Sequence, residues 1–167
     1  MDESETDSDH ISGHNRNYNG TTKRKGVELS LEHYFDKITI SESITYMNTE
    51  FKDEKDIPGI PNLKANLNIN YSVTEKLTLN NSWEYYGKSY SNGDVNNEGE
   101  KVDDYILTGL SLRYNFGNGL VINGGINNLF NEKYYDYVGG IKTSNTDNRN
   151  YYPAPERNFY AGFKYNF

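Results

Sequence analysis

The feature that most constrains this chain is a strict alternation of apolar and polar side chains over residues 63–73. Apolar residues occupy every second position of this stretch, namely Leu63, Ala65, Leu67, Ile69, Tyr71 and Val73. A period of two is typical of a β-strand with two different faces, and it does not fit an amphipathic helix. The stretch therefore predicts a strand with one apolar and one polar face.

Six further stretches alternate in the same way, so the sequence predicts seven strands: 26–34, 38–46, 63–73, 77–85, 106–116, 120–126 and 159–167. Three of the links between them are short, at 35–37, 74–76 and 117–119. The other three are long and polar, at roughly 49–61, 88–103 and 132–157. Short turns on one side and long loops on the other are typical of a transmembrane β-barrel. We expect an all-β, antiparallel meander with short periplasmic turns and long extracellular loops.

Composition limits the other classes. The chain is 34% hydrophobic with a mean hydropathy of −0.92 and has no long apolar run, which argues against a transmembrane helix. It has no cysteine, and its net charge of −7 argues against a nucleic-acid partner. Residues 1–25 lack periodicity and a signal-peptide pattern, so we expect a flexible acidic and polar segment, the remnant of an extracellular loop. His10 and His14 are expected to lie in this solvated segment rather than to bind metal.

Aromatic residues recur at one end of every second predicted strand. If the short turns are periplasmic, Phe35, Tyr71, Tyr114 and Phe116 all lie near the periplasmic ends of descending strands. Membrane barrels carry aromatic girdles at this level, so these residues are predicted to form the periplasmic girdle and lipid is predicted to cover the apolar face. Glu42 and Asn81 fall in the apolar register. A bulge that turns Glu42 inward and a position near a membrane interface both remain open.

The last predicted strand places Phe159, Phe163, Tyr165 and Phe167 at alternate positions up to the final residue. This pattern resembles the C-terminal signature of bacterial outer-membrane barrels, which the barrel-assembly machinery reads. The resemblance predicts that these four residues form an outer-membrane assembly signal. The alternative is an ordinary amphipathic edge strand.

Two motifs in the last third resemble the C-terminal barrel region of TonB-dependent outer-membrane receptors. They are GINNLFNEKY at 125–134 and YYPAPERNF at 151–159, although Glu156 stands where that family usually has glycine. Weaker matches are KGVEL at 25–29, IPGIP at 57–61 and YGKSY at 86–90, so that the resemblance spans about residues 24–167. It implies a barrel of about 22 strands with an N-terminal plug, in the outer membrane of a Gram-negative bacterium.

Such receptors import scarce nutrients, most often ferric siderophores or haem, with energy relayed by TonB. The resemblance implies that residues 26–167 form the last seven strands of this barrel. Plug and TonB box would be missing from the chain, and the TonB complex would act through that missing N-terminal part. No catalytic residue, cofactor or metal ligand is predicted, and the ligand-binding residues are unknown. Aromatic and polar loop residues could contact ligand or could simply pack: Tyr134, Tyr135, Tyr137, Arg149 and Tyr151. The lumen-facing Lys64, Glu84 and Arg113 are expected to pair with each other or with the plug.

Three other functions fit less well. A complete eight-stranded barrel with a structural or adhesive role needs one more strand within residues 1–25, where nothing alternates. A membrane enzyme needs a serine, histidine and acid arrangement, and the histidine on a predicted strand, His33, has no partner motif. A soluble sugar-binding β-sandwich does not explain aromatic residues at the same end of every second strand.

Overall fold

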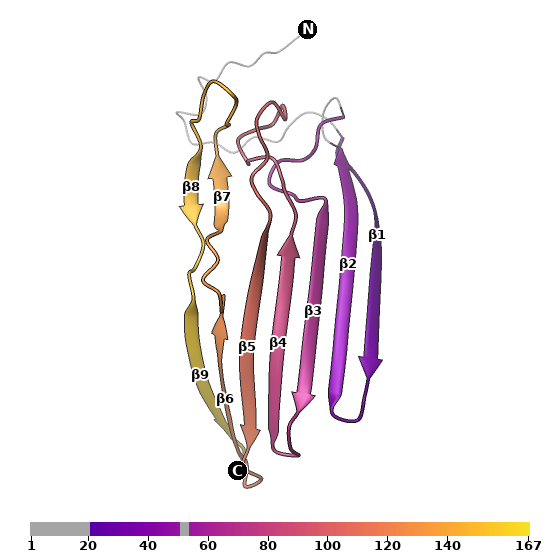
Figure 1. Cartoon of the computed structure of the whole chain (residues 1–167), viewed down its shortest axis with the longest axis vertical. Helices are drawn as coiled ribbons and strands as arrows, with labels where there is room; N and C mark the ends of the chain where they lie inside the picture. Colours follow the sequence, from indigo (N-terminus) through magenta and orange to yellow (C-terminus); the bar gives the residue numbers. More distant parts are fainter. Residues whose placement is uncertain (1–20, 51–53) are drawn as a thin grey trace.

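The computed structural model describes residues 21–50 and 54–167 and shows a seven-stranded antiparallel sheet with a hairpin at one end (Figure 1). The strands of the sheet are β1 Lys23–Tyr34, β2 Ile38–Glu50, β3 Leu63–Ser72, β4 Leu77–Tyr86, β5 Tyr105–Asn115, β6 Leu120–Asn127 and β9 Asn158–Tyr165. They are ordered β1-β2-β3-β4-β5-β6-β9, and the sheet does not close on itself. This confirms the predicted all-β meander. In the described part of the chain, no helix has the length and hydropathy needed to cross a membrane.

The structure differs from the predicted strands at several strand ends and in one loop. Strand β1 begins at Lys23, three residues before the predicted start, β2 continues to Glu50, and β9 ends at Tyr165. The predicted loop at 132–157 contains a hairpin, formed by β7 (Tyr135–Gly139) and β8 (Asn150–Pro153). The register of this hairpin shifts between Tyr135 and Tyr137, and such a shift breaks the period of two by which strands are recognised. The predictions made for residues 1–20, including His10 and His14, lie outside the described residues.

The register of the sheet gathers the apolar side chains on one face. One cross-strand row, for example, contains Leu29, Ile44, Ala65, Tyr85 and Ile106. The opposite face is polar, and its side chains bond to one another across strands, as in the pairs Ser43–Asn66 at 3.2 Å and Asn70–Asn80 at 2.9 Å. Large apolar side chains remain exposed on the apolar face, and the exposed fraction of Phe163 is 78%. The sheet therefore needs an apolar environment outside itself.

The three short links lie at one end of the sheet and the three long loops at the other (Figure 1). In the β5–β6 turn, Gly117 has a φ of 82° and Gly119 a φ of 89°, values that glycine adopts without strain. Thr74 closes the β3–β4 turn by accepting a hydrogen bond from the Leu77 amide at 3.0 Å. This arrangement of turns and loops is the predicted one.

Glu42 stays on the apolar face, because its neighbours pair without a break and it lies opposite Leu31 and Leu67. The inward-turning bulge considered from the sequence is therefore wrong. The Glu42 carboxylate oxygen lies 3.1 Å from Nε2 of His33, so that two polar side chains of the apolar face satisfy each other. The sequence had shown no partner for His33, because the partner comes from the neighbouring strand.

Asn81 is accommodated on the same face by two hydrogen bonds. Its side-chain amide donates to the carbonyl oxygen of Gly109 at 2.9 Å, and its side-chain oxygen accepts a bond from the indole N–H of Trp83. Polar atoms in an apolar environment are costly unless they are paired. Asn81 is thus a bonded element of the face rather than a defect.

Leucine substitutions at the His33–Glu42 pair and at Asn81 are expected to have opposite effects on stability. Replacing both His33 and Glu42 by leucine should stabilise the complete barrel in lipid vesicles by about 2 kcal/mol, since a pair of polar side chains in an apolar environment is commonly no better than packed hydrophobic residues. Asn81→Leu should destabilise it by about 1–2 kcal/mol, because the Trp83 N–H loses its acceptor. Urea unfolding in vesicles measures both changes. A destabilised double variant would contradict this account of the Glu42 pair.

Candidate ligand site

The loops β4–β5 and β6–β9 meet through their backbones at the end of the sheet opposite the short turns. The Asn92 amide donates to the Val138 carbonyl at 2.7 Å, and the Val138 amide donates to the Asn92 side-chain oxygen at 3.2 Å. The Ser91 hydroxyl donates to the carbonyl oxygen of Gly140. A Cβ atom at Gly93 would collide with the Gly140 backbone, so the loops approach more closely than any other residue at 93 would allow.

A buried carboxylate organises the β4–β5 loop. Asp94 is 2% exposed and accepts hydrogen bonds from the amides of Glu98 and Gly99 at 2.9 and 2.8 Å. The same loop binds the β2–β3 loop, because the Asp56 amide donates to the Asn97 side-chain oxygen at 2.6 Å. All three long loops are thus joined into one layer.

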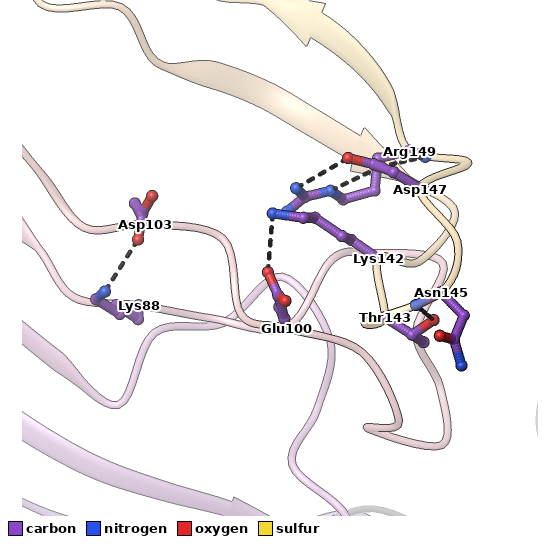
Figure 2. A network of polar contacts seen from close by, with 8 residues as sticks. All are labelled: Lys88, Glu100, Asp103, Lys142, Thr143, Asn145, Asp147 and Arg149. Carbon is purple, nitrogen blue, oxygen red and sulfur yellow. Dashed lines mark hydrogen bonds and ion pairs between the residues drawn. The ribbon is translucent and has the colours of Figure 1, made fainter.

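Ion pairs add to this layer (Figure 2). Lys142 of the β6–β9 loop lies 2.9 Å from Glu100 of the β4–β5 loop, and Lys88 lies 2.9 Å from Asp103 within the latter. The hydrogen bond from Lys88 lowers the pKa of the Asp103 carboxyl, and the bond to Glu100 raises the pKa of the Lys142 ammonium. These groups are solvent-exposed, so each pair contributes little to stability but fixes where the charges lie.

Below the loop layer lies a cavity of about 190 Å³ at the end of the polar face. Its lining comes from β3 and β4, from the start of β5, and from all three loops. Its aromatic and charged lining residues include Lys64, Tyr86, Tyr90, Asp103, Tyr105, Tyr135 and Asp136. Its volume is below the range of about 300–1,000 Å³ that is usual for sites enclosing a whole small molecule, so it has room for one group of a ligand, which the aromatic rings and charged side chains of the wall would contact.

Three tyrosine rings form a column beside this cavity. The ring centres of Tyr86 and Tyr105 are 4.9 Å apart with nearly parallel planes, and those of Tyr105 and Tyr134 are 5.0 Å apart. The ammonium of Lys64 lies over Tyr86, 5.4 Å from the ring centre. Burial, followed by the nearby charge of Asp136, raises the pKa of the Tyr134 hydroxyl. The column joins the strands to the loop layer.

Of the five loop residues named from the sequence, Tyr135 lines the cavity and Tyr134 completes the column. Tyr137, Tyr151 and Arg149 belong to the hairpin and the loop inside it and do not line the cavity. Arg149 bonds to Asp147 and lies 5.4 Å from the Tyr151 ring centre. The sequence reasoning missed Tyr86 and Tyr105. Both lie in the polar register of their strands, where an aromatic residue is out of pattern and could have been noticed.

The expected pairing of lumen residues with one another is not seen in the described ranges. Lys64 lies over the Tyr86 ring, and Glu84 accepts a hydrogen bond from the Tyr86 hydroxyl at 3.0 Å. No ion pair of Arg113 occurs within the part of the chain that the structure describes. Lys64 and Glu84 therefore both contact Tyr86 rather than each other.

The residues predicted for the girdle all lie towards the end of the sheet with the short turns. Phe35 is in the β1–β2 turn, Tyr71 is near the end of β3, and the rings of Tyr114 and Phe116 meet edge to face at 4.7 Å at the end of β5. Of the predicted assembly-signal residues, Phe159, Phe163 and Tyr165 lie in β9 and Phe167 comes two residues after it. Phe159 and Phe163 are exposed on the apolar face, and the rings of Tyr165 and Phe167 meet edge to face at 5.0 Å. Both roles remain predictions.

The motif at 125–134 has a structural explanation. Asn128 and Asn131 adopt left-handed backbone conformations, with φ of 51° and 57°, which asparagine tolerates better than most residues. The Asn128 side chain is bonded to both the amide and the carbonyl of Glu132, at 2.8 Å each. Phe130 lies beside Trp83, with ring centres 6.0 Å apart. The motif thus ends β6, directs the chain into the hairpin and packs it against the wall.

An antiparallel meander with one apolar and one polar face, short turns at one end and joined loops at the other defines a section of a membrane β-barrel wall. The model of one family, described as "TonB dependent receptor-like, beta-barrel", matches residues 2–129. This match covers more than half of the chain, and the chain therefore belongs to the family of TonB-dependent receptors, as its motifs implied. That family consists of receptors and transporters of the Gram-negative outer membrane and is not an enzyme class.

Solved structures with the same fold include three receptors and transporters. The ferric enterobactin receptor PfeA from Pseudomonas aeruginosa, in a mutant form, is 22% identical with a TM-score of 0.67, over 85% of this chain and 22% of that chain. The copper transporter OprC is 18% identical with a TM-score of 0.68, over 87% and 23%. The ferric-catecholate import receptor Fiu from E. coli is 18% identical with a TM-score of 0.65, over 89% and 22%. The chain thus spans about a fifth of the length of these proteins.

Proposed function

We propose that this chain forms part of the barrel wall of a TonB-dependent receptor that imports a scarce nutrient as an iron complex, a ferric siderophore or haem. The observation that carries the proposal is the tyrosine-lined cavity, which three joined loops line together with the polar face of a receptor-type wall. The names of PfeA and Fiu refer to iron complexes, which supports iron, and that of OprC refers to copper.

The proposal assigns partners to the surfaces of the chain. Outer-membrane lipid covers the apolar face, with the ring of Tyr71 and its girdle neighbours at the periplasmic boundary. The barrel-assembly machinery reads the last strand, up to Phe167. The TonB complex acts on a part of the receptor outside the described residues, and the ligand reaches the cavity from the side of the loops.

The first experiment is to sequence the DNA upstream of the Met1 codon. We expect an open reading frame, continuous with this chain, that encodes a plug domain and further strands. A signal peptide directly before Met1 would instead support the eight-stranded barrel, whose extra strand would fall in residues 1–20, outside the described residues. That result would overturn the receptor proposal.

The second experiment measures uptake. Deleting the gene of the complete receptor should abolish import of at least one radioactive iron complex, and deleting the TonB gene should cause the same loss without a further effect in the double deletion. Complementation with the receptor gene is the control. Unchanged import of ferric siderophores and haem in the deletion strain would refute iron complexes as the ligand.

A further inference from the structure

The cavity is lined by three ionisable side chains other than tyrosine, namely Lys64, Asp103 and Asp136. The Asp103 carboxylate pairs with Lys88 at 2.9 Å. The Lys64 ammonium lies over the Tyr86 ring, which does not cancel its positive charge, at one end of the tyrosine column, whereas the charge of Asp136 acts on Tyr105 and Tyr134. No ion pair of Asp136 occurs within residues 21–50 and 54–167, so that among the described residues this end of the cavity presents a carboxylate.

A second carboxylate lies at the edge of the tyrosine column. Glu84 accepts a hydrogen bond from the Tyr86 hydroxyl at 3.0 Å, and this bond to a carboxylate increases the electron density of the Tyr86 ring. Tyr105 and Tyr135 add two further rings to the cavity wall near Asp136. Around Asp136 the wall thus combines a carboxylate with electron-rich ring faces.

Ring faces in this region already bind cations of the chain itself. The Lys101 ammonium lies 4.7 Å from the centre of Tyr90, another lining residue, while it pairs with Asp56 at 3.3 Å. Aromatic faces attract ammonium and guanidinium groups, and more strongly where water is excluded. An anionic group placed beside Asp136 would be repelled by Coulomb interaction.

From this arrangement we infer that the imported complex presents a cationic group, an alkylammonium or a guanidinium, to the wall formed by Asp136, Tyr105 and Tyr135. The inference rests on the proposed function and adds the charge class of its ligand. The carboxylate provides the charge, the rings provide a face for the alkyl part, and complexes with an anionic surface are disfavoured.

A matched series of probes tests the inference on the complete receptor. A ferric trihydroxamate that keeps one free ammonium group carries a charge of about +1, its N-acetylated form is neutral, and its N-succinylated form carries about −1, from the ordinary pKa values of these groups. Binding of each is measured by fluorescence quenching. We expect affinity to fall in this order, by roughly fivefold to tenfold per step, as for a single partly exposed charge contact.

Asp136→Asn should remove most of this dependence on charge, while Asp147→Asn, whose carboxylate bonds to Arg149 away from the cavity, should leave it intact. Equal or inverted affinities in the unaltered receptor, or an unchanged order in Asp136→Asn, would overturn the inference. Asp136→Asn is tested in the same way on any complex that the uptake experiment yields outside this series. Import of an anionic complex that this variant binds as before also overturns it.

Failure of the inference and failure of the proposed function give different results. If TonB-dependent import of an iron complex occurs but the charge of the complex has no effect on affinity, the proposed function stands and only the charge class is wrong. If the receptor imports no iron complex, the proposed function itself fails.

Discussion

Deleting Phe167 from the complete receptor should lower its amount in the outer membrane about fivefold to tenfold. Tyr165 would then lose the ring that meets it edge to face at 5.0 Å. Such a ring pair contributes about 1 kcal/mol, which corresponds to roughly a fivefold change in an equilibrium, and the proposed assembly signal would lose its last residue as well. Surface labelling of intact cells measures the effect.

Phe167→Tyr is the matched control, because it keeps a terminal aromatic ring, and it should assemble nearly as the unaltered receptor does. Transcript levels must be equal in all strains. Unchanged surface labelling after deletion of Phe167 would refute the assembly role and leave the last strand as an ordinary amphipathic one.

The second large effect is expected at Gly140, where the loops meet. Its φ of 67° is strained for any β-branched residue, and an added Cβ would collide with the Asn148 carbonyl oxygen. Strain of this kind costs about 1–3 kcal/mol, so Gly140→Val should separate the two loops and weaken ligand binding by at least about tenfold. Titration with the complex identified by uptake measures the affinity.

Gly139→Ala is the control for this prediction. Gly139 has no positive φ, and the nearest atom to its added Cβ is a ring carbon of Tyr137 at 3.2 Å, part of a side chain that can move. This variant should bind ligand nearly normally, and both variants should assemble, because the strands are unaffected. Normal binding by Gly140→Val would show that the cavity does not depend on the joined loops.

The strands could be predicted because alternation is a local property of the sequence. The extent of β3 was predicted to within one residue, since eleven positions in succession obey the period of two. The partner of His33 could not be predicted, because Glu42 reaches it only through the register of two strands. Register depends on the turn and on pairing along the whole strand rather than on either residue alone.

The cavity could not be predicted from the sequence for a similar reason. It is formed where Tyr86 and Tyr105, nineteen positions apart, stack across a strand pair, and where Asp136 of β7 adds its carboxylate to the lining. The hairpin was missed because its shifted register removes the alternation near Tyr137. Local patterns predict the wall, whereas the site depends on contacts between distant segments.

The contact between Gly93 and Gly140 also limits how such a receptor can be redesigned. Because the two loops share backbone hydrogen bonds, a length change in one displaces the other, and the β2–β3 loop follows through the bond between Asp56 and Asn97. Replacing a single loop by one from another receptor should therefore leave the layer of three long loops poorly ordered. The three segments 54–62, 87–104 and 128–157 are better exchanged together, as one cassette that carries ligand choice on an unchanged wall.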